Sequence, residues 1–143
     1  MTIQYVGYGK MKIRKAKKED IESLVNLDRE ANKEIKWWNP LKRKDFLKFL
    51  KNKNCLYVAE EDNKVVGYQS ARREEKTMIL EDIYVKKEFR GKKMATFLIK
   101  RIIFINKKFG ITQIKFNCPE RLRRFYERFG FKVSSLVMKK ELK

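Results

Sequence analysis

The sequence contains no histidine, which excludes much of the usual chemistry of enzyme sites. Ser-His-Asp and Cys-His catalysis, the H-E-x-x-H zinc site and the Cys-His zinc finger all need that side chain. Only two cysteines are present, Cys55 and Cys118, and their wide separation fits neither a disulfide framework nor a metal-ligand pattern. Acid-base work is therefore left to Asp, Glu, Tyr, Lys or Cys, and no metal is expected.

Long apolar runs are also absent. The apolar stretches are a few residues long and are interrupted by lysines, so no membrane-spanning helix and no membrane partner are expected. Residues 1–10, MTIQYVGYGK, lack the apolar region of a signal peptide, which makes the cytoplasm the expected location.

Acidic residues are scarce relative to basic ones. Lys and Arg number 37 against 18 Asp and Glu, giving a formal charge of +19. A field of this strength attracts polyanions and anionic ligands. Lysine-rich solvated faces are the alternative explanation, because the lysines are spread along the chain.

The 143 residues include 43% hydrophobic and 13% aromatic side chains, enough to fold despite the charge. We find no internal repeat, linker or low-complexity segment, so residues 1–143 are expected to form a single domain, with residues 1–10 as an extra strand or a tail. Periodicity and turn residues predict the order β-α-α-β-β-β-α-β-α-β. The strands are expected at 11–16, 55–61, 64–74, 77–85, 111–116 and in the tail after Gly130. The helices are expected from about residue 20, from Asn39-Pro40, over about 92–109, and from Cys118-Pro119 to Gly130.

The stretch EFRGKKMAT, residues 88–96, is a strand-to-helix turn with the chemistry of an anion site. A helix N-terminus presents unpaired N–H groups and a positive dipole end, and Gly91 lets the main chain approach an anion closely. Arg90, Lys92 and Lys93 add charge, and Ala95 keeps the first turn slim. An ordinary helix start with solvated lysines is the alternative. The next glycine is Gly110, so neither of the nucleotide-binding motifs G-x-G-x-x-G and G-x-x-x-x-G-K-[ST] is present in this turn.

Two carboxylates and three aromatic side chains are further candidates. Glu81 and Asp82 lie in an apolar strand and are expected on opposite faces, so at least one must enter a cleft or be paired. A salt bridge to a lysine is the structural alternative. Tyr126 lies next to the apolar residues that face the core in the last predicted helix, and its hydroxyl needs a hydrogen-bond partner. Trp37 and Trp38 either seal the core or form a wall of a substrate pocket.

LEDIYVKKEFRGKKMA, the amphipathic helix after it, a short strand ending in Asn117, and RRFYERFGF together resemble the GNAT superfamily of N-acetyltransferases. The resemblance implies an α+β fold of mixed three-layer type, with a central, mostly antiparallel sheet of six to seven strands flanked by about four helices. It also implies acetyl-CoA as cofactor, with its pyrophosphate on the turn amides. Lys93 stands where the family has glycine and is expected to take an ordinary helical φ. The implied cofactor contacts are Ile83, Tyr84, Val85, Arg90, Gly91, Lys92, Lys93, Met94, Ala95, Thr96 and Asn117.

The resemblance further implies acetyl transfer to a primary amine, on a protein N-terminus, a lysine or a small molecule. Direct transfer is favoured because no histidine can activate Cys118. Tyr126 would assist the leaving sulfur and Glu81 the amine, while Asp82, Trp37 and Trp38 would bind the acceptor. The alternative is a catalytically degenerate, strongly basic GNAT-fold protein that binds nucleic acid or another partner. A ribonucleoprotein association and a monomer or homodimer are both compatible with the sequence.

Overall fold

The computed structural model describes residues 4–5, 11–35, 39–91 and 93–142. These residues form an α+β fold of six strands and four α-helices. The strands are β1 (Gln4–Tyr5), β2 (Lys12–Lys15), β3 (Leu56–Glu61), β4 (Lys64–Glu74), β5 (Thr77–Val85) and β6 (Gln113–Lys115). The helices are α1 (Ile21–Glu34), α2 (Arg43–Leu50), α3 (Met94–Lys108) and α4 (Arg123–Glu127), with short 3-10 turns at Lys18–Asp20, Lys87–Phe89 and Glu120–Leu122. Among the described helices, none is long and apolar enough to cross a membrane.

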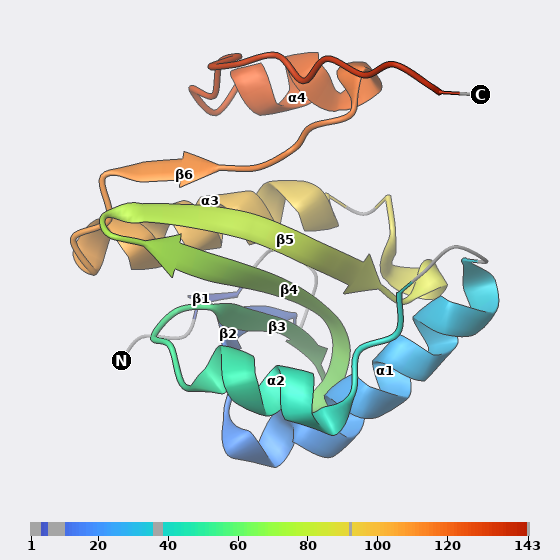
Figure 1. Ribbon diagram of the computed structural model, residues 1–143. Helices are drawn as coiled ribbons and strands as arrows, with labels where there is room; N and C mark the ends of the chain where they lie inside the picture. Colours follow the sequence, from blue (N-terminus) through green and yellow to red (C-terminus); the bar gives the residue numbers. More distant parts are fainter. Residues whose placement is uncertain (1–3, 6–10, 36–38, 92, 143) are drawn as a thin grey trace.

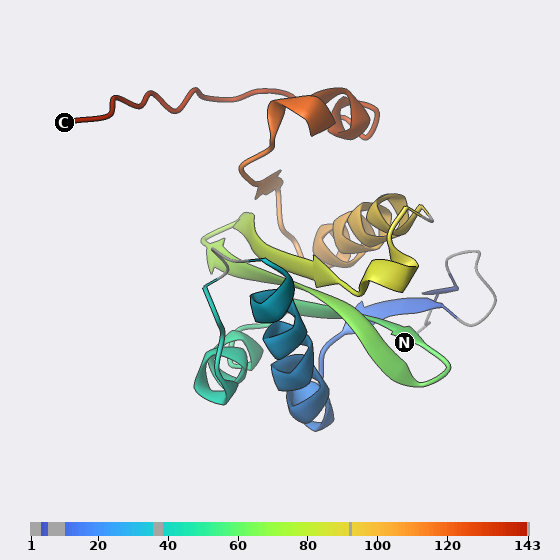
Figure 2. The same ribbon diagram turned by 90° about the vertical axis from the view of Figure 1, so that its right-hand side faces the viewer.

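The strands make one sheet in sequential order, β1-β2-β3-β4-β5-β6. Every neighbouring pair is antiparallel except β5 and β6, which are parallel. Parallel strands need a crossover connection, and α3 supplies it. Helices α1 and α2 cover one face of the sheet and α3 covers the other (Figures 1 and 2). The predicted mixed, mostly antiparallel fold is therefore confirmed.

Each face of the sheet has its own apolar core. On the α1 face, Leu24 and Leu27 pack against Tyr68 and Tyr84 of the sheet. On the α3 face, Met78 and Leu80 pack against α3 residues such as Ile102. Both arrangements follow from helices with one apolar stripe lying on strands with alternating faces.

Helix α2 begins later than the sequence predicts. We expected Asn39 as the cap and Pro40 as the first helical residue, but the helix starts at Arg43. The Asp45 carboxylate accepts a hydrogen bond of 2.7 Å from the Lys42 amide, and Asp28 on α1 accepts one of 2.5 Å from the Leu41 amide. These acceptors fix the entry of the chain into the helix, so the cap prediction was wrong.

The expected last strand is absent from residues 131–142 as the structure describes them. This segment runs in an extended path away from the sheet (Figure 2). Leu136, Val137 and Met138 are 80%, 85% and 87% exposed. A strand needs a paired edge, and β6 offers only three residues for pairing. The fourth helix is also shorter than expected, because the chain after Pro119 first makes a 3-10 turn.

Candidate active site

Strands β5 and β6 separate after a short paired stretch. The parallel ladder runs from Thr77–Gln113 to Ile79–Lys115, and β5 then continues to Val85 without β6 beside it. A cavity of about 830 Å³ lies along this separation, walled by β5, α3, the end of β6 and α4. It brings together six residues that the sequence predicts for the site: Glu81, Asp82, Ile83, Ala95, Asn117 and Tyr126.

A β-bulge places the two carboxylates of β5 on the same face of the sheet. Gln69 pairs with Ile83 and Ala71 with Leu80, so Glu81 and Asp82 together oppose the single residue Ser70. An extra residue of this kind shifts the alternation of side chains and commonly re-aims them at a site. The contacts agree, because Arg72 and Ser70, which share one face of β4, hold Glu81 and Asp82 respectively. The expectation of opposite faces was therefore wrong.

The two carboxylates have different surroundings. Glu81 is exposed, and the Arg72 guanidinium donates a hydrogen bond of 3.2 Å to it. Asp82 is half-buried; the Ser70 hydroxyl donates to its Oδ2 at 3.4 Å. Burial, and then the neighbouring charge of Glu81, raises the pKa of Asp82. The structural alternative, pairing with a cation, thus holds for Glu81 but with an arginine.

The main chain of β5 aims two amides toward the open edge. The Lys86 amide bonds to the Val66 carbonyl, and antiparallel pairs alternate between hydrogen-bonded and non-bonded positions. Tyr84 is therefore in a bonded pair with Tyr68, while the N–H groups of Ile83 and Val85 point away from β4. They face the side from which β6 has diverged. Both amides belong to residues that the resemblance implies as cofactor contacts.

The turn after β5 enters α3 through two residues with left-handed backbone. Gly91 has φ 72° and Lys93 has φ 61°, so the predicted helical φ of Lys93 was wrong. A Cβ built on Gly91 would meet no atom within 4 Å, which leaves its main chain open. The first turn of α3 contains no acidic residue and no side-chain cap. Its orphan N–H groups and dipole therefore suit an anion.

Several predicted cofactor residues lie outside the cavity. Met94 is buried in a core cluster with Met11 and Ile13, so only its main chain can serve a ligand. Thr96 is partly buried in the first turn of α3. The Tyr84 hydroxyl and the Arg90 guanidinium both bond to Glu34 on α1. Lys92, Trp37 and Trp38 lie outside the described residues, and their roles stay predictions.

Tyr126 reaches the cavity from α4. Its ring packs edge-on against Phe116, Phe125 and Phe131, with centroids 4.6, 4.9 and 6.0 Å away. Burial, and then the charge of Cys118, raises the pKa of Tyr126. Its hydroxyl therefore stays protonated at neutral pH and can donate a hydrogen bond.

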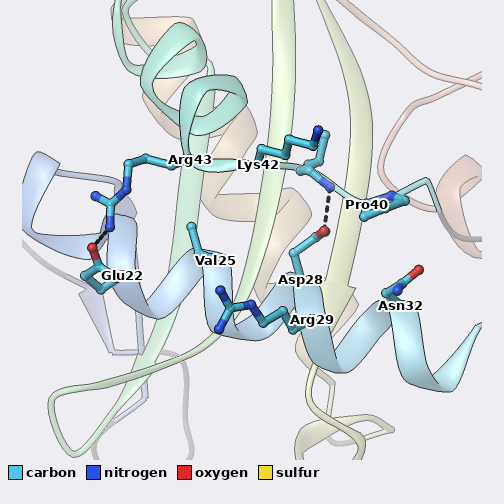
Figure 3. A pocket seen from close by; sticks show the side chains of 9 residues that line it. Glu22, Val25, Asp28, Arg29, Asn32, Pro40, Lys42 and Arg43 are labelled. Atoms are coloured by element: carbon cyan, nitrogen blue, oxygen red, sulfur yellow. Dashed lines mark hydrogen bonds and ion pairs between the residues drawn. The ribbon is translucent and has the colours of Figure 1, made fainter.

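A second, smaller cavity of about 360 Å³ lies between α1 and the chain that leads into α2 (Figure 3). Arg29 and Asn32 line it from α1, and Pro40 and Lys42 line it from the other side. Asp28 is 1% exposed and accepts hydrogen bonds from the Leu41 amide and from the Tyr68 hydroxyl. Of the predicted site residues that the structure describes, none lines this cavity, and Asp28 has a structural explanation in these bonds.

Sequence reasoning missed Arg72, Ser70 and Glu34. Arg72 and Ser70 become partners of the carboxylates only through the register of β4 against β5. Glu34 is separated from Arg90 by 56 residues. No local sequence pattern reports contacts of this range.

Comparison with known proteins agrees with the geometry. A sequence model of the acetyltransferase (GNAT) domain matches residues 52–133. A relative described as an uncharacterized N-acetyltransferase of Methanocaldococcus jannaschii is 32% identical over 136 residues, covering 90% of this chain and 83% of the relative. The chain belongs to the GNAT acetyltransferase family. The resemblance stated from the sequence is thereby confirmed.

Solved structures share the same fold. The PaiA N-acetyltransferase of Thermoplasma acidophilum in complex with coenzyme A superposes with a TM-score of 0.72 and 22% identity, covering 89% of this chain and 92% of that one. An aminoglycoside acetyltransferase from an uncultured soil metagenomic sample gives 0.71 at 18% identity, with coverages of 94% and 98%. Glucosamine-6-phosphate N-acetyltransferase from Arabidopsis thaliana gives 0.66 at 19%, with 93% and 99%. At these identities the likeness concerns the fold.

Proposed function

We propose that this GNAT-family protein moves the acetyl group of acetyl-CoA directly to a primary amine in a ternary complex. The observation that carries the proposal is the cavity at the separation of β5 and β6. Glu81 and Asp82, which lie on the same face of β5, line this cavity together with Tyr126 of α4. An acceptor base and a donor for the leaving group are the two groups that such a transfer needs.

The residues of the turn fit the phosphates of coenzyme A. Gly91 leaves open space for close approach, and the first turn of α3 has neither a competing cap nor a repelling carboxylate. The amides of residues 93–96 and the positive end of the helix would hold the pyrophosphate. Asn117, exposed after β6, and the edge of β5 flank the path toward the cavity. Acetyl-CoA, when bound, supplies an activated acetyl thioester.

The carboxylates could remove a proton from the incoming amine. Deprotonating a lysine-like ammonium group with pKa about 10.4 costs roughly 4 to 5 kcal/mol at pH 7, whereas an α-amine with pKa near 8 costs about 1 to 1.5 kcal/mol. Glu81, exposed at the cavity, is placed to attract the ammonium group. Burial raises the pKa of Asp82, which makes it a better proton acceptor than an ordinary aspartate, while the Glu81 carboxylate is held by the Arg72 guanidinium. We therefore propose Asp82 as the group that accepts the proton of the amine, a role that the sequence analysis assigns to Glu81.

Tyr126 and the β5 edge serve the other half of the reaction. Tyrosine with pKa about 10 is already a weaker acid than a thiol at about 8.5, by roughly 2 kcal/mol, and its burial widens this gap. Hydrogen bonding to the departing sulfur is thus its role, without full proton transfer. The N–H groups of Ile83 and Val85 would donate to the oxygen of the acetyl group as its negative charge develops.

Charge suggests where the acceptor is found. Aminoglycoside and glucosamine-6-phosphate acetyltransferases are among the proteins of the same fold, which supports an amine acceptor. The net charge of +19 disfavours a free polycation and favours an amine carried by an anionic assembly, such as a protein bound to nucleic acid.

The test is a thermal-shift assay with acetyl-CoA, followed by measurement of free-thiol release with a panel of amines and peptides. Stabilisation by the cofactor and thiol release that depends on an amine are expected. No stabilisation at millimolar cofactor, combined with steeply salt-dependent binding to mixed-sequence DNA or RNA, would instead establish the degenerate nucleic-acid-binding alternative.

A further inference from the structure

The last residue of α1 holds the chain that leads into the turn of the cofactor site. Arg90 donates from Nη1 and Nη2 to the two carboxylate oxygens of Glu34, at 2.6 and 2.8 Å. Its Nε donates at 2.8 Å to the carbonyl of Val85, the last residue of β5. The Tyr84 hydroxyl donates to Glu34 at 2.9 Å, and the Arg90 guanidinium lies 5.2 Å from the Tyr84 ring centroid. We call Glu34, Tyr84 and Arg90 the Glu34 clamp.

A glutamate at position 34 does not stabilise helix α1. A carboxylate in the last turn of a helix faces the negative end of the dipole, which costs about 0.3 to 1 kcal/mol. The Glu34 and Arg90 side chains are 36% and 39% exposed, and exposed ion pairs contribute only about 0 to 1 kcal/mol to folding. The clamp therefore adds little to the free energy of unfolding.

Glu34 does not strengthen the attraction of the turn for phosphate either. Arg90 precedes Gly91 directly, where an uncompensated cation would favour the pyrophosphate. Glu34 neutralises that cation and accepts two of its five N–H groups, and the Val85 carbonyl accepts a third. A bidentate arginine pair fixes orientation as well as distance. What the clamp supplies is a fixed geometry for the backbone on either side of Arg90.

We propose that Glu34 is a positioning residue for the cofactor site, which acts through Arg90 to hold the turn at Gly91 and Lys93 in its binding conformation. This inference rests on the proposed binding of coenzyme A. Arg90, predicted from the sequence as a cofactor contact, stays on Glu34 in the complex. Because Glu34 ends α1, cofactor binding also orders the C-terminal turn of that helix.

The experiment measures coenzyme A binding by calorimetry for the wild type, Glu34→Gln, Arg90→Lys and the double variant. Glu34→Gln is expected to weaken binding about tenfold, within the range of couplings between linked sites. Arg90→Lys keeps the charge but loses the bidentate geometry and is expected to weaken binding similarly. The double variant should be no weaker than either single one, since both changes remove the same clamp. In kinetics the KM for acetyl-CoA should rise with kcat nearly unchanged.

Hydrogen exchange gives a readout that does not depend on activity. In the protein without ligand, Glu34→Gln should speed exchange of the amides in 86–91, and coenzyme A should slow exchange in 31–35 only in the wild type. Glu30→Gln is the matched control. It removes an equal charge one turn earlier on α1, from an exposed pair with Lys86 at 3.6 Å, and should leave binding and exchange near wild type.

The sign of the change decides between geometry and charge. If Glu34→Gln binds coenzyme A as well as or better than the wild type, electrostatics governs the turn and the positioning role is refuted. Equal weakening by Glu30→Gln would refute it as well. A wild-type protein that binds no coenzyme A would overturn the proposed function, and this inference with it.

Discussion

Replacing Lys93 with glycine tests whether the departure from the family glycine strains the cofactor turn. Lys93 has φ 61° and ψ 17° at the start of α3. Left-handed backbone costs an L-residue about 1 to 2 kcal/mol, whereas glycine adopts it freely but loses about 0.5 to 1 kcal/mol more in chain entropy. Lys93→Gly is therefore expected to raise the free energy of unfolding by about 0.5 to 1 kcal/mol and Tm by about 2 to 4 °C.

The same residue should have opposing effects on coenzyme A binding. Its ammonium attracts phosphate by about 1 kcal/mol at 4 Å in water, so Lys93→Ala, which keeps the Cβ and loses the charge, should bind coenzyme A roughly fivefold more weakly. Lys93→Gly loses the same charge but lets the amides approach the phosphate. It should bind more tightly than Lys93→Ala.

The assays are thermal unfolding and calorimetric titration with coenzyme A. Glu75→Gly is the matched control, because Glu75 has φ 54° in an exposed turn between β4 and β5. It should raise Tm comparably without changing coenzyme A affinity. A Lys93→Gly protein less stable than wild type would refute the strain argument. Equal coenzyme A affinity of the glycine and alanine variants would refute the argument from close approach.

Two further substitutions test the proposed chemistry. Tyr126→Phe keeps the ring packing on Phe116 but loses the hydrogen bond to a charged sulfur, and kcat should fall about 10- to 100-fold with coenzyme A affinity unchanged; unchanged turnover would remove Tyr126 from the mechanism. Asp82→Asn should abolish most activity yet raise Tm at neutral pH. Since burial raises the pKa of Asp82, the folded state retains a proton that the unfolded state loses as pH rises above about 4, and the aspartate then destabilises the fold. The gain in Tm should therefore be absent near pH 3, and a gain of equal size at both pH values would contradict the assigned burial effect.

Features that depend on neighbours in the chain could be predicted from the sequence. Strand β5 has the predicted bounds, Thr77–Val85, because it is an apolar segment with buried and exposed positions that lies between two polar turns. The hairpin turn at Asp62 and Asn63 takes the left-handed conformation that these residues tolerate, and α3 ends before Gly110 with φ 86°. The short motifs around Gly91 and Tyr126 were sufficient to indicate the family.

The contacts between these parts depend on how distant segments of the chain pack together. The bulge that turns Glu81 and Asp82 to one face exists in the pairing of β4 with β5, and alternation along β5 alone predicted the opposite. Lys93 has left-handed backbone because of the way the turn joins β5 to α3. Lysine ordinarily favours a helical φ, so the residue type alone does not predict this conformation. The contact of Glu34 with Arg90 joins residues far apart in the sequence, so it forms only when α1 lies beside the end of β5. Local propensity acts over a few residues, whereas register and packing set these long-range contacts.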